Sequence, residues 1–327
     1  MVLTIDNAVI LYYTVDMNKK MPGVPESAQN EASARAFVES IVWPNGPVCP
    51  HCGATDVYRM VPKATSKAPG RSGLLRCRPC KRQFTVTVGT IFESSHIPLH
   101  KWLMCIHFMT ASKKGISAHQ LHRMLGITYK AAWFMAHRIR HAMKSGGFNG
   151  KLPGKVEVDE TYIGGKQENR SNDMRFREIQ PKKTPVMALV TRSGKARAFA
   201  IKNAGKVVLQ SNIIRNVSEG AAVYTDQAGM YKGVGRFVNG GHETVNHSRK
   251  QYVRPGNIHT NSVESFFSLL KRGIVGTFHH ISNQHLDAYC GEFSFRWSKS
   301  KATDRERAVS LIAATVGKRL VYAEMMA

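Results

Sequence analysis

The second half of the chain alternates between two periods of apolar residues. A period of two predicts strands, whereas apolar residues three and four positions apart predict helices. Strands are expected at 156–165, 186–190, 196–201 and 221–226, and a helix at 207–217. Ser193-Gly194 separates the two middle strands and predicts a hairpin.

A further helix is expected from Asn261 onward, with two unlike faces. One stripe is apolar at helical spacing and should face a core: Val263, Phe266, Phe267, Leu270 and Ile274. The opposite stripe is polar: Asn261, Glu264, Ser268 and Lys271. These polar residues are three, four and three positions apart, so their side chains should point the same way. An acid and a base would therefore share one exposed helix face.

The first half of the chain predicts mainly helices. A short helix is expected over 33–42 and three helices over 98–144. The second and third of these flank a break at Gly126-Ile127, and the third is basic, which is typical of a helix-turn-helix that binds DNA. Its DNA contacts would come from Lys130, Arg138 and Arg140. A helical bundle that only joins two domains has the same spacing, so this alternative stays open.

Two pairs of cysteines indicate a metal site. Cys49 and Cys52 form one C-x-x-C pair, Cys77 and Cys80 form another, and 24 residues lie between them. This spacing is typical of a zinc ribbon, in which four thiolates hold one structural zinc ion and leave no open position for catalysis. The alternative is four unrelated free cysteines. Basic residues crowd the same segment, which could give it a nucleic-acid contact surface.

The net charge of the chain indicates the kind of partner that it binds. The chain of 327 residues has 47 Lys and Arg against 22 Asp and Glu, a formal net charge of +25. Such an excess favours a nucleic-acid partner. No run approaches the roughly 20 apolar residues of a membrane helix, and the first 15 residues lack the basic start of a signal peptide. Paired cysteines of the metal-binding kind also suit a reducing compartment, so we expect a cytoplasmic, nucleoid-associated protein.

The combined pattern predicts a multidomain α+β protein. The expected segments are an N-terminal segment (1–34), a zinc ribbon (35–92), a helical helix-turn-helix DNA-binding region (93–148), an α/β catalytic domain with a mixed sheet (149–300) and a helical tail (301–327).

Three acids lie at distinctive places in the predicted catalytic domain. Asp159 lies on the first strand, Asp226 ends a later strand, and Glu264 lies on the polar stripe of the helix. The predicted elements follow the order of a ribonuclease-H-like fold: a strand with an acid, a hairpin, a helix, a second strand with an acid, and a helix with an acid. Three converging carboxylates are costly to ionise together. Two divalent cations, Mg²⁺ or Mn²⁺, would offset that cost and support in-line phosphoryl displacement.

Each acid also has a purely structural interpretation. Asp159 could be a surface acid, and Glu157 or Glu160 would fit that role equally well. Asp226 could form a turn. Asn261 could be the N-cap of the helix, with Glu264 completing a capping box.

Several longer motifs coincide with those of one known family. They are Cys49-Pro50-His51-Cys52-Gly53, Cys77-Arg78-Pro79-Cys80, Val158-Asp159-Glu160-Thr161-Tyr162-Ile163-Gly164-Gly165, Thr225-Asp226, His259-Thr260-Asn261-Ser262-Val263-Glu264-Ser265-Phe266, Leu269-Leu270-Lys271-Arg272-Gly273, Gly276-Thr277-Phe278-His279-His280-Ile281-Ser282 and Glu292-Phe293-Ser294-Phe295-Arg296-Trp297. On these motifs the chain resembles the DDE transposases of bacterial insertion sequences, in particular the ISXO2-like group, over roughly residues 35 to 300.

The resemblance implies an enzyme that binds the terminal inverted repeats of its element, cleaves there and transfers the 3′ ends to target DNA. It implies metal ligation by Asp159, Asp226 and Glu264, with Asn261 as the alternative third ligand. Lys271, together with Arg272, would contact the DNA backbone beside the metals, and the enzyme would work as a homo-oligomer on paired ends. The alternatives are a non-catalytic DNA-binding regulator and a ribonuclease-H-like nuclease without strand transfer.

Overall fold

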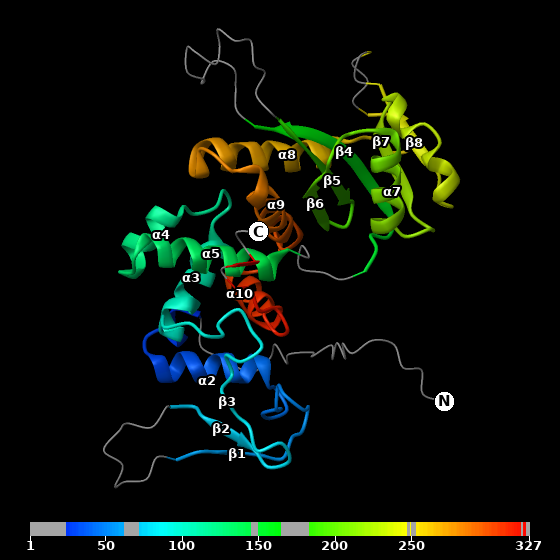
Figure 1. Ribbon diagram of the computed structural model, residues 1–327. Coiled ribbons are helices and arrows are strands. Elements are labelled where there is room, and N and C mark those ends of the chain that lie inside the picture. The colour runs from blue at the N-terminus through cyan, green and yellow to red at the C-terminus, as the bar shows by residue number, and fades with distance from the viewer. Residues whose placement is uncertain are drawn as a thin grey trace, which may run out of the picture.

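The computed structural model describes residues 24–61, 72–144, 150–164, 183–246, 249, 253–321 and 323–324. Three parts follow one another from the bottom to the top of Figure 1: a small sheet, a group of helices, and a larger sheet with helices on both faces. The predicted multidomain α+β architecture is therefore confirmed.

The small sheet has three short antiparallel strands. They are β1 (Val57–Arg59), β2 (Leu75–Cys77) and β3 (Gln83–Phe84), in the order β1-β2-β3. Leu75, Phe84 and two of the cysteines form its small core. The ring of Trp43 meets that of Phe84 edge-on at 5.9 Å between centroids. So few apolar residues make a weak core, and a metal would supply much of its stability.

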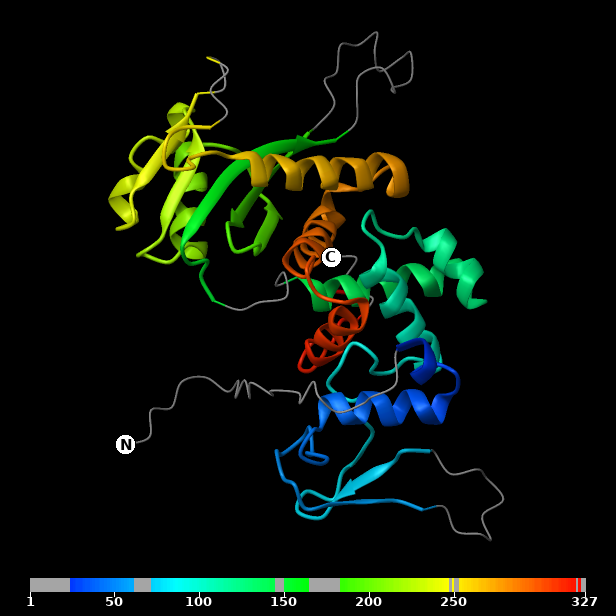
Figure 2. The same ribbon diagram turned by 180° about the vertical axis from the view of Figure 1, so that it is seen from behind.

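The helical region is built from both ends of the chain. Its helices are α1 (Val24–Ser27), α2 (Glu31–Val42), α3 (Leu99–Ala111), α4 (Ala118–Leu125), α5 (Tyr129–Met143) and α10 (Asp304–Ala313). The hydroxyls of Ser117 and Thr128 cap α4 and α5, and Gly126 turns between them with φ +58°. The predicted pair of helices around a glycine turn is thus present. Helix α10 packs against α2 and α3, so the C-terminal tail joins the core of this region (Figure 2).

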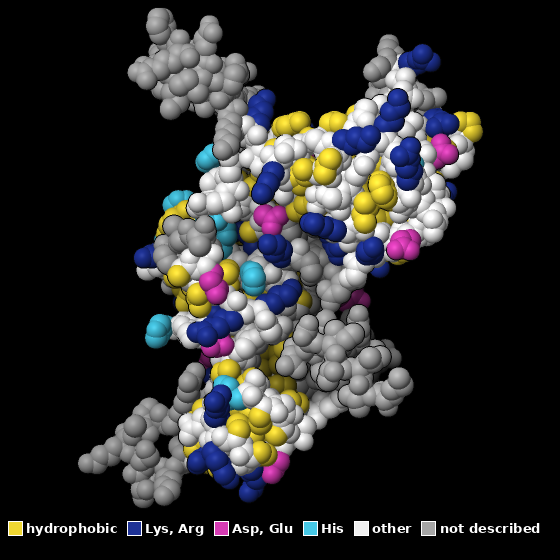
Figure 3. All heavy atoms as spheres, turned by 45° about the vertical axis from the view of Figure 1, so that its right-hand side comes forward, with side chains coloured by type: hydrophobic (Ala, Val, Ile, Leu, Met, Phe, Trp, Pro, Cys, Tyr) yellow, Lys and Arg dark blue, Asp and Glu magenta, His cyan; other side chains and the backbone are white. Residues whose placement is uncertain are grey.

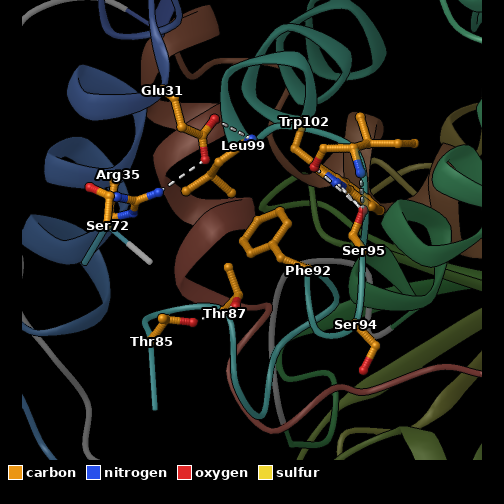
Figure 4. A pocket seen from close by; sticks show the side chains of 11 residues that line it. Glu31, Arg35, Ser72, Thr85, Thr87, Phe92, Ser94, Ser95, Leu99 and Trp102 are labelled. Carbon is orange, nitrogen blue, oxygen red and sulfur yellow. Dashed lines mark hydrogen bonds and ion pairs between the residues drawn. The ribbon is translucent and has the colours of Figure 1, made fainter. Parts of the chain in front are cut away.

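A polar pocket of about 170 Å³ marks the junction between the ribbon and the helical region (Figure 4). Helix α3 follows Pro98, which has no side-chain acceptor to offer as a cap. The Glu31 carboxylate of α2 takes that place, accepting hydrogen bonds from the backbone N–H groups of Leu99 (2.6 Å) and His100 (3.3 Å). Arg35 pairs with the same carboxylate at 3.2 Å. The polar groups of this pocket therefore join α2 to α3.

The larger sheet is mixed. Its strands are β4 (Lys155–Ile163), β5 (Thr184–Thr191), β6 (Ala196–Ala200), β7 (Ala222–Asp226) and β8 (His242–Val245). The spatial order is β6-β5-β4-β7-β8, with β5 antiparallel to both β4 and β6, and β7 parallel to both β4 and β8. The hairpin and the mixed sheet expected from the sequence are both present.

Helices cover the two faces of this sheet (Figures 1 and 2). One face packs on α7 (Lys206–Asn216), whose Leu209 and Ile213 join Val156 and Val158 of β4 in one core. The other face packs on α8 (Asn261–Gly273) and α9 (Asn283–Ser298). Helix α8 buries its predicted apolar stripe and leaves its polar stripe toward solvent.

Helix α9 joins the large sheet to the helical region. On one side, the hydroxyls of Ser294 and Ser298 each accept a backbone N–H of the edge strand β6, at 2.9 Å. On the other side, the buried carboxylate of Glu292 pairs with Arg140 of α5 at 2.6 Å and with Arg296. Burial alone would raise the pKa of Glu292, but the two guanidinium groups hold it below its usual value.

Candidate functional site

The three predicted acids occupy the places that the expected fold assigns to them. Asp159 lies on β4, the central strand, and Asp226 is the last residue of the neighbouring strand β7. Glu264 lies in the first turn of α8, which packs on β4 and β5. Asp159 shares a strand face with Glu157, the face that α8 covers.

The two strands separate at the acids. Parallel pairing of β4 with β7 ends at Glu157 and Tyr224. Asp159 and Asp226 each lie two residues beyond this last pair. The chain places β5 and β6 on one side of β4 and then places β7 and β8 on the other side. The acids therefore lie at a topological switch point, which is where open α/β sheets usually bind their ligands. The register therefore puts both acids at the point where the two strands separate.

Electrostatics at this point disfavour ionised Asp159. Burial, together with the neighbouring carboxylates of Glu160, Asp226 and Glu264, raises the pKa of this carboxyl to about 7, against one hydrogen bond from the Glu160 N–H at 2.8 Å. Positive charge placed between these acids would reverse the effect. The oxygens of these acids lie farther apart than the ligand atoms of a closed metal site. Among the described residues, the group whose ligand atoms all lie within 4.8 Å of one another is formed by the four cysteines.

Asn261 does not cap helix α8. The helix begins at Asn261 itself, and the preceding Thr260 donates its hydroxyl to Glu264 at 3.1 Å. The capping-box alternative is therefore wrong, because Asn261 is inside the helix and Glu264 lies one position beyond N3. Asn261 and Glu264 remain on one exposed stripe, and both stay candidates for the third ligand.

Two further acids of β4 have structural partners that the sequence did not reveal. Glu157 is 0% exposed and contacts the start of α8, so it is no surface acid. Glu160 points to the opposite face and accepts a hydrogen bond from the buried hydroxyl of Tyr231. Burial raises the pKa of Glu160, as does the nearby Asp226. Neither partner could have been inferred from local pattern, because Tyr231 lies 71 residues away in the chain.

The four cysteines fit a tetrahedral zinc ion. The sulfur atoms of Cys49 and Cys80 are 3.7 Å apart, and those of Cys52 and Cys77 are 3.6 Å apart. Four Zn–S bonds of about 2.3 Å require sulfur separations of about 3.8 Å. A hydrogen bond from the Arg82 backbone lowers the pKa of the Cys80 thiol to about 7, whereas burial raises the pKa of the Cys49 thiol, so Cys80 ionises more readily than Cys49. The geometry supports a structural zinc site.

Two of the predicted DNA contacts on α5 are buried and therefore wrong. Arg138 is 4% exposed and donates to the Glu93 carbonyl at 2.6 Å, and Arg140 is 2% exposed and pairs with Glu292. Helix α5 packs against α3, α4 and α9, so beyond its first turn it joins domains, as the bundle alternative expected. Lys130 in that first turn is exposed, as are Lys271 and Arg272 on α8.

Basic residues of the ribbon, which the sequence offered as a nucleic-acid contact surface, line a hollow. A depression of about 250 Å³ is lined by Tyr58, Arg76, Arg78 and Lys81, together with Cys77. The guanidinium of Arg78 lies over the Tyr58 ring at 5.1 Å and pairs with Asp56 at 3.2 Å. Figure 3 shows further Lys and Arg side chains spread from the ribbon to the large sheet, with few acidic ones among them. The positive charge is therefore extended along the molecule.

None of the helices in the described parts of the chain is both long and apolar enough to cross a membrane.

Comparisons with known protein families match two parts of the chain, the large-sheet domain and the ribbon. Residues 151–298, which carry the three acids, match the family model of the ISXO2-like transposase domain. Residues 29–83, which carry the four cysteines, match that of a transposase zinc-ribbon domain. A protein of Halobacterium salinarum, described as an uncharacterized protein in transposable element ISH50, is 27% identical over 278 residues. That alignment covers 82% of this chain and 90% of the relative.

Proposed function

Because residues 151–298 form an ISXO2-like transposase domain and residues 29–83 a transposase zinc ribbon, we propose that this chain is the transposase of an insertion sequence. It would bind the ends of its element, cleave there and transfer the 3′ ends to target DNA. The observation that carries this proposal is the placement of Asp159, Asp226 and Glu264 around the point where β4 and β7 separate.

The acids would hold divalent cations, Mg²⁺ or Mn²⁺. Hard cations prefer carboxylate oxygens, and the mutual repulsion around Asp159 indicates a site that lacks positive charge. When bound, the cations would supply the Lewis acidity that in-line displacement at phosphorus needs. Asp159 must lose its proton to become a ligand, so its pKa of about 7 makes cation binding dependent on pH. Asn261 is the alternative to Glu264 as third ligand.

Exposed basic residues would bind the phosphate backbone. Lys271 lies two helical turns after Glu264, about 10 Å along α8, and Arg272 follows it. Lys130 and the basic hollow of the ribbon extend this contact to the other end of the molecule. Such contacts make affinity fall steeply with salt. We propose double-stranded DNA as the partner, with terminal inverted repeats and target DNA bound by a homo-oligomer on paired ends, in the cytoplasm at the nucleoid.

A strand-transfer assay tests the function. Wild-type protein with Mg²⁺ and DNA carrying the element's ends should cleave and join the 3′ ends to a target duplex. Asp159→Ala and Asp226→Ala should lose both steps and still bind end DNA. Binding without metal-dependent nicking by the wild type would instead indicate a regulator. Hydrolysis without joining would indicate a nuclease, and cleavage that survives in both variants would refute the acid site.

A further inference from the structure

The start of helix α8 is held by a residue of the central strand. The first backbone N–H groups of a helix need acceptors from outside its own hydrogen-bond ladder. One Glu157 carboxylate oxygen accepts from the N–H groups of Ser262 (2.7 Å) and Val263 (3.0 Å). The other oxygen accepts from the Ser262 hydroxyl at 2.8 Å. A negative charge at this place also complements the helix dipole.

The Glu157 carboxylate is enclosed and matched in charge. It is 0% exposed, and the Arg192 guanidinium lies 2.7 Å from it. Arg192 also donates to the carbonyls of Asn257 (3.2 Å) and His259 (3.1 Å), in the segment that leads into α8. The acid therefore ties three pieces of backbone together: β4, the approach to the helix and the helix start.

These contacts lie directly beside the predicted ligands. Glu157 is two residues before Asp159 on the same strand face, and its partners Ser262 and Val263 immediately precede Glu264. The apolar packing of α8 begins at Val263 and continues along the helix through Phe266, Phe267 and Leu270. Apolar contacts are not directional, whereas hydrogen bonds to individual N–H groups fix both the depth and the rotation of a helix.

We propose that Glu157 is a positioning residue, which sets α8 so that Glu264 and Asn261 face Asp159 and Asp226 where β4 and β7 separate. This inference rests on the proposed metal-binding function of those acids. Its effect on the cation is indirect, through the helix, and it should appear as a loss of cation affinity when the length of the side chain changes. Aspartate retains the charge but withdraws the carboxylate by one methylene group.

The chain supplies a matched control. Glu31 accepts the first N–H groups of α3 and pairs with Arg35, as Glu157 does for α8 with Arg192. Helix α2, which carries Glu31, lies beside the ribbon and away from β4, β7 and α8 in Figure 1. Glu31→Asp therefore makes the same chemical change to a helix cap away from the acids, at a side chain that is 42% exposed where that of Glu157 is 0% exposed.

The test measures Mn²⁺ binding to the full-length protein by electron paramagnetic resonance, alongside its binding of end DNA. Asp159→Asn defines the signal of the acid site. We expect Glu157→Asp to weaken Mn²⁺ binding about tenfold, as changes in groups that support ligands do, and to leave DNA binding unchanged. Glu31→Asp should leave both unchanged. Ser262→Ala deletes one hydrogen bond to the carboxylate, so it should give a smaller loss and keep the test decisive when Glu157→Asp does not fold.

Wild-type Mn²⁺ affinity in both Glu157→Asp and Ser262→Ala would overturn the positioning role. An equal loss in Glu31→Asp would overturn it as well, because general loosening would then explain the effect. Identical Mn²⁺ signals in the wild type and Asp159→Asn would refute the acid site itself, and with it the proposed function.

Discussion

Asp159 is expected to destabilise the folded protein at neutral pH. Burial and three neighbouring carboxylates raise its pKa from 3.8 to about 7. In the unfolded chain the same carboxyl ionises near its ordinary value, so between these two values the folded state binds a proton that the unfolded state does not. Stability from this group is therefore complete below about pH 4, falls as the pH rises and reaches its minimum above about pH 7.

The size of the effect follows from the shift. About 3 pKa units correspond to about 4 kcal/mol, which is an upper bound because water reaches this half-buried carboxyl. Asparagine has nearly the same shape and no charge. In buffer without added divalent cation, we expect Asp159→Asn to raise the free energy of unfolding by about 1–3 kcal/mol at pH 8. The gain should shrink steadily as the pH falls toward 4.

Thermal unfolding, followed by circular dichroism at several pH values, measures this gain in the stability of Asp159→Asn over the wild type. Added Mn²⁺ should raise the Tm of the wild type at pH 8 and leave that of Asp159→Asn unchanged, because a ligand stabilises only the protein that binds it. Asp56→Asn, on an exposed ribbon acid paired with Arg78, is the control and should shift stability by less than about 0.5 kcal/mol. A wild type as stable as Asp159→Asn at pH 8, or a gain independent of pH, would refute the reasoning.

Two further predictions concern the basic residues. Arg140→Ala should lower the free energy of unfolding by about 3–5 kcal/mol in denaturant titrations, because it leaves Glu292 buried without one of its partners. Lys130→Ala, at an exposed residue of the same helix, should instead weaken DNA binding and leave stability unchanged. Changing Arg76, Arg78 and Lys81 together to Gln should reduce the slope of log Kobs against log salt concentration by about 3. The same charge change at Lys202, Lys206 and Lys232, next to α7 on the face opposite the acids, should leave that slope unchanged. Equal slopes for the two triple variants would show that the hollow has no special part in binding.

The fold was largely predictable because it depends on local periods and short spacings. Alternating apolar residues predicted β4 and β7, and the polar stripe of α8 was correctly placed from Glu264 and Lys271. The C-x-x-C pairs predicted the cluster of four sulfur atoms because each tight knuckle aims two thiols at one point. The place of each acid in the fold followed from the order of the elements.

The tertiary structure decided the roles of charged side chains, since a charge gains its meaning from neighbours that are distant in sequence. Arg140 was predicted to contact DNA, yet its partner Glu292 lies 152 residues away and holds it in the interior. Glu157 resembled any strand acid until α8, 105 residues later, placed its first N–H groups against it. Sequence by itself determined which elements form and which residues could do chemistry. Only the packing of those elements determined which charged side chains pair inside the protein and which remain exposed.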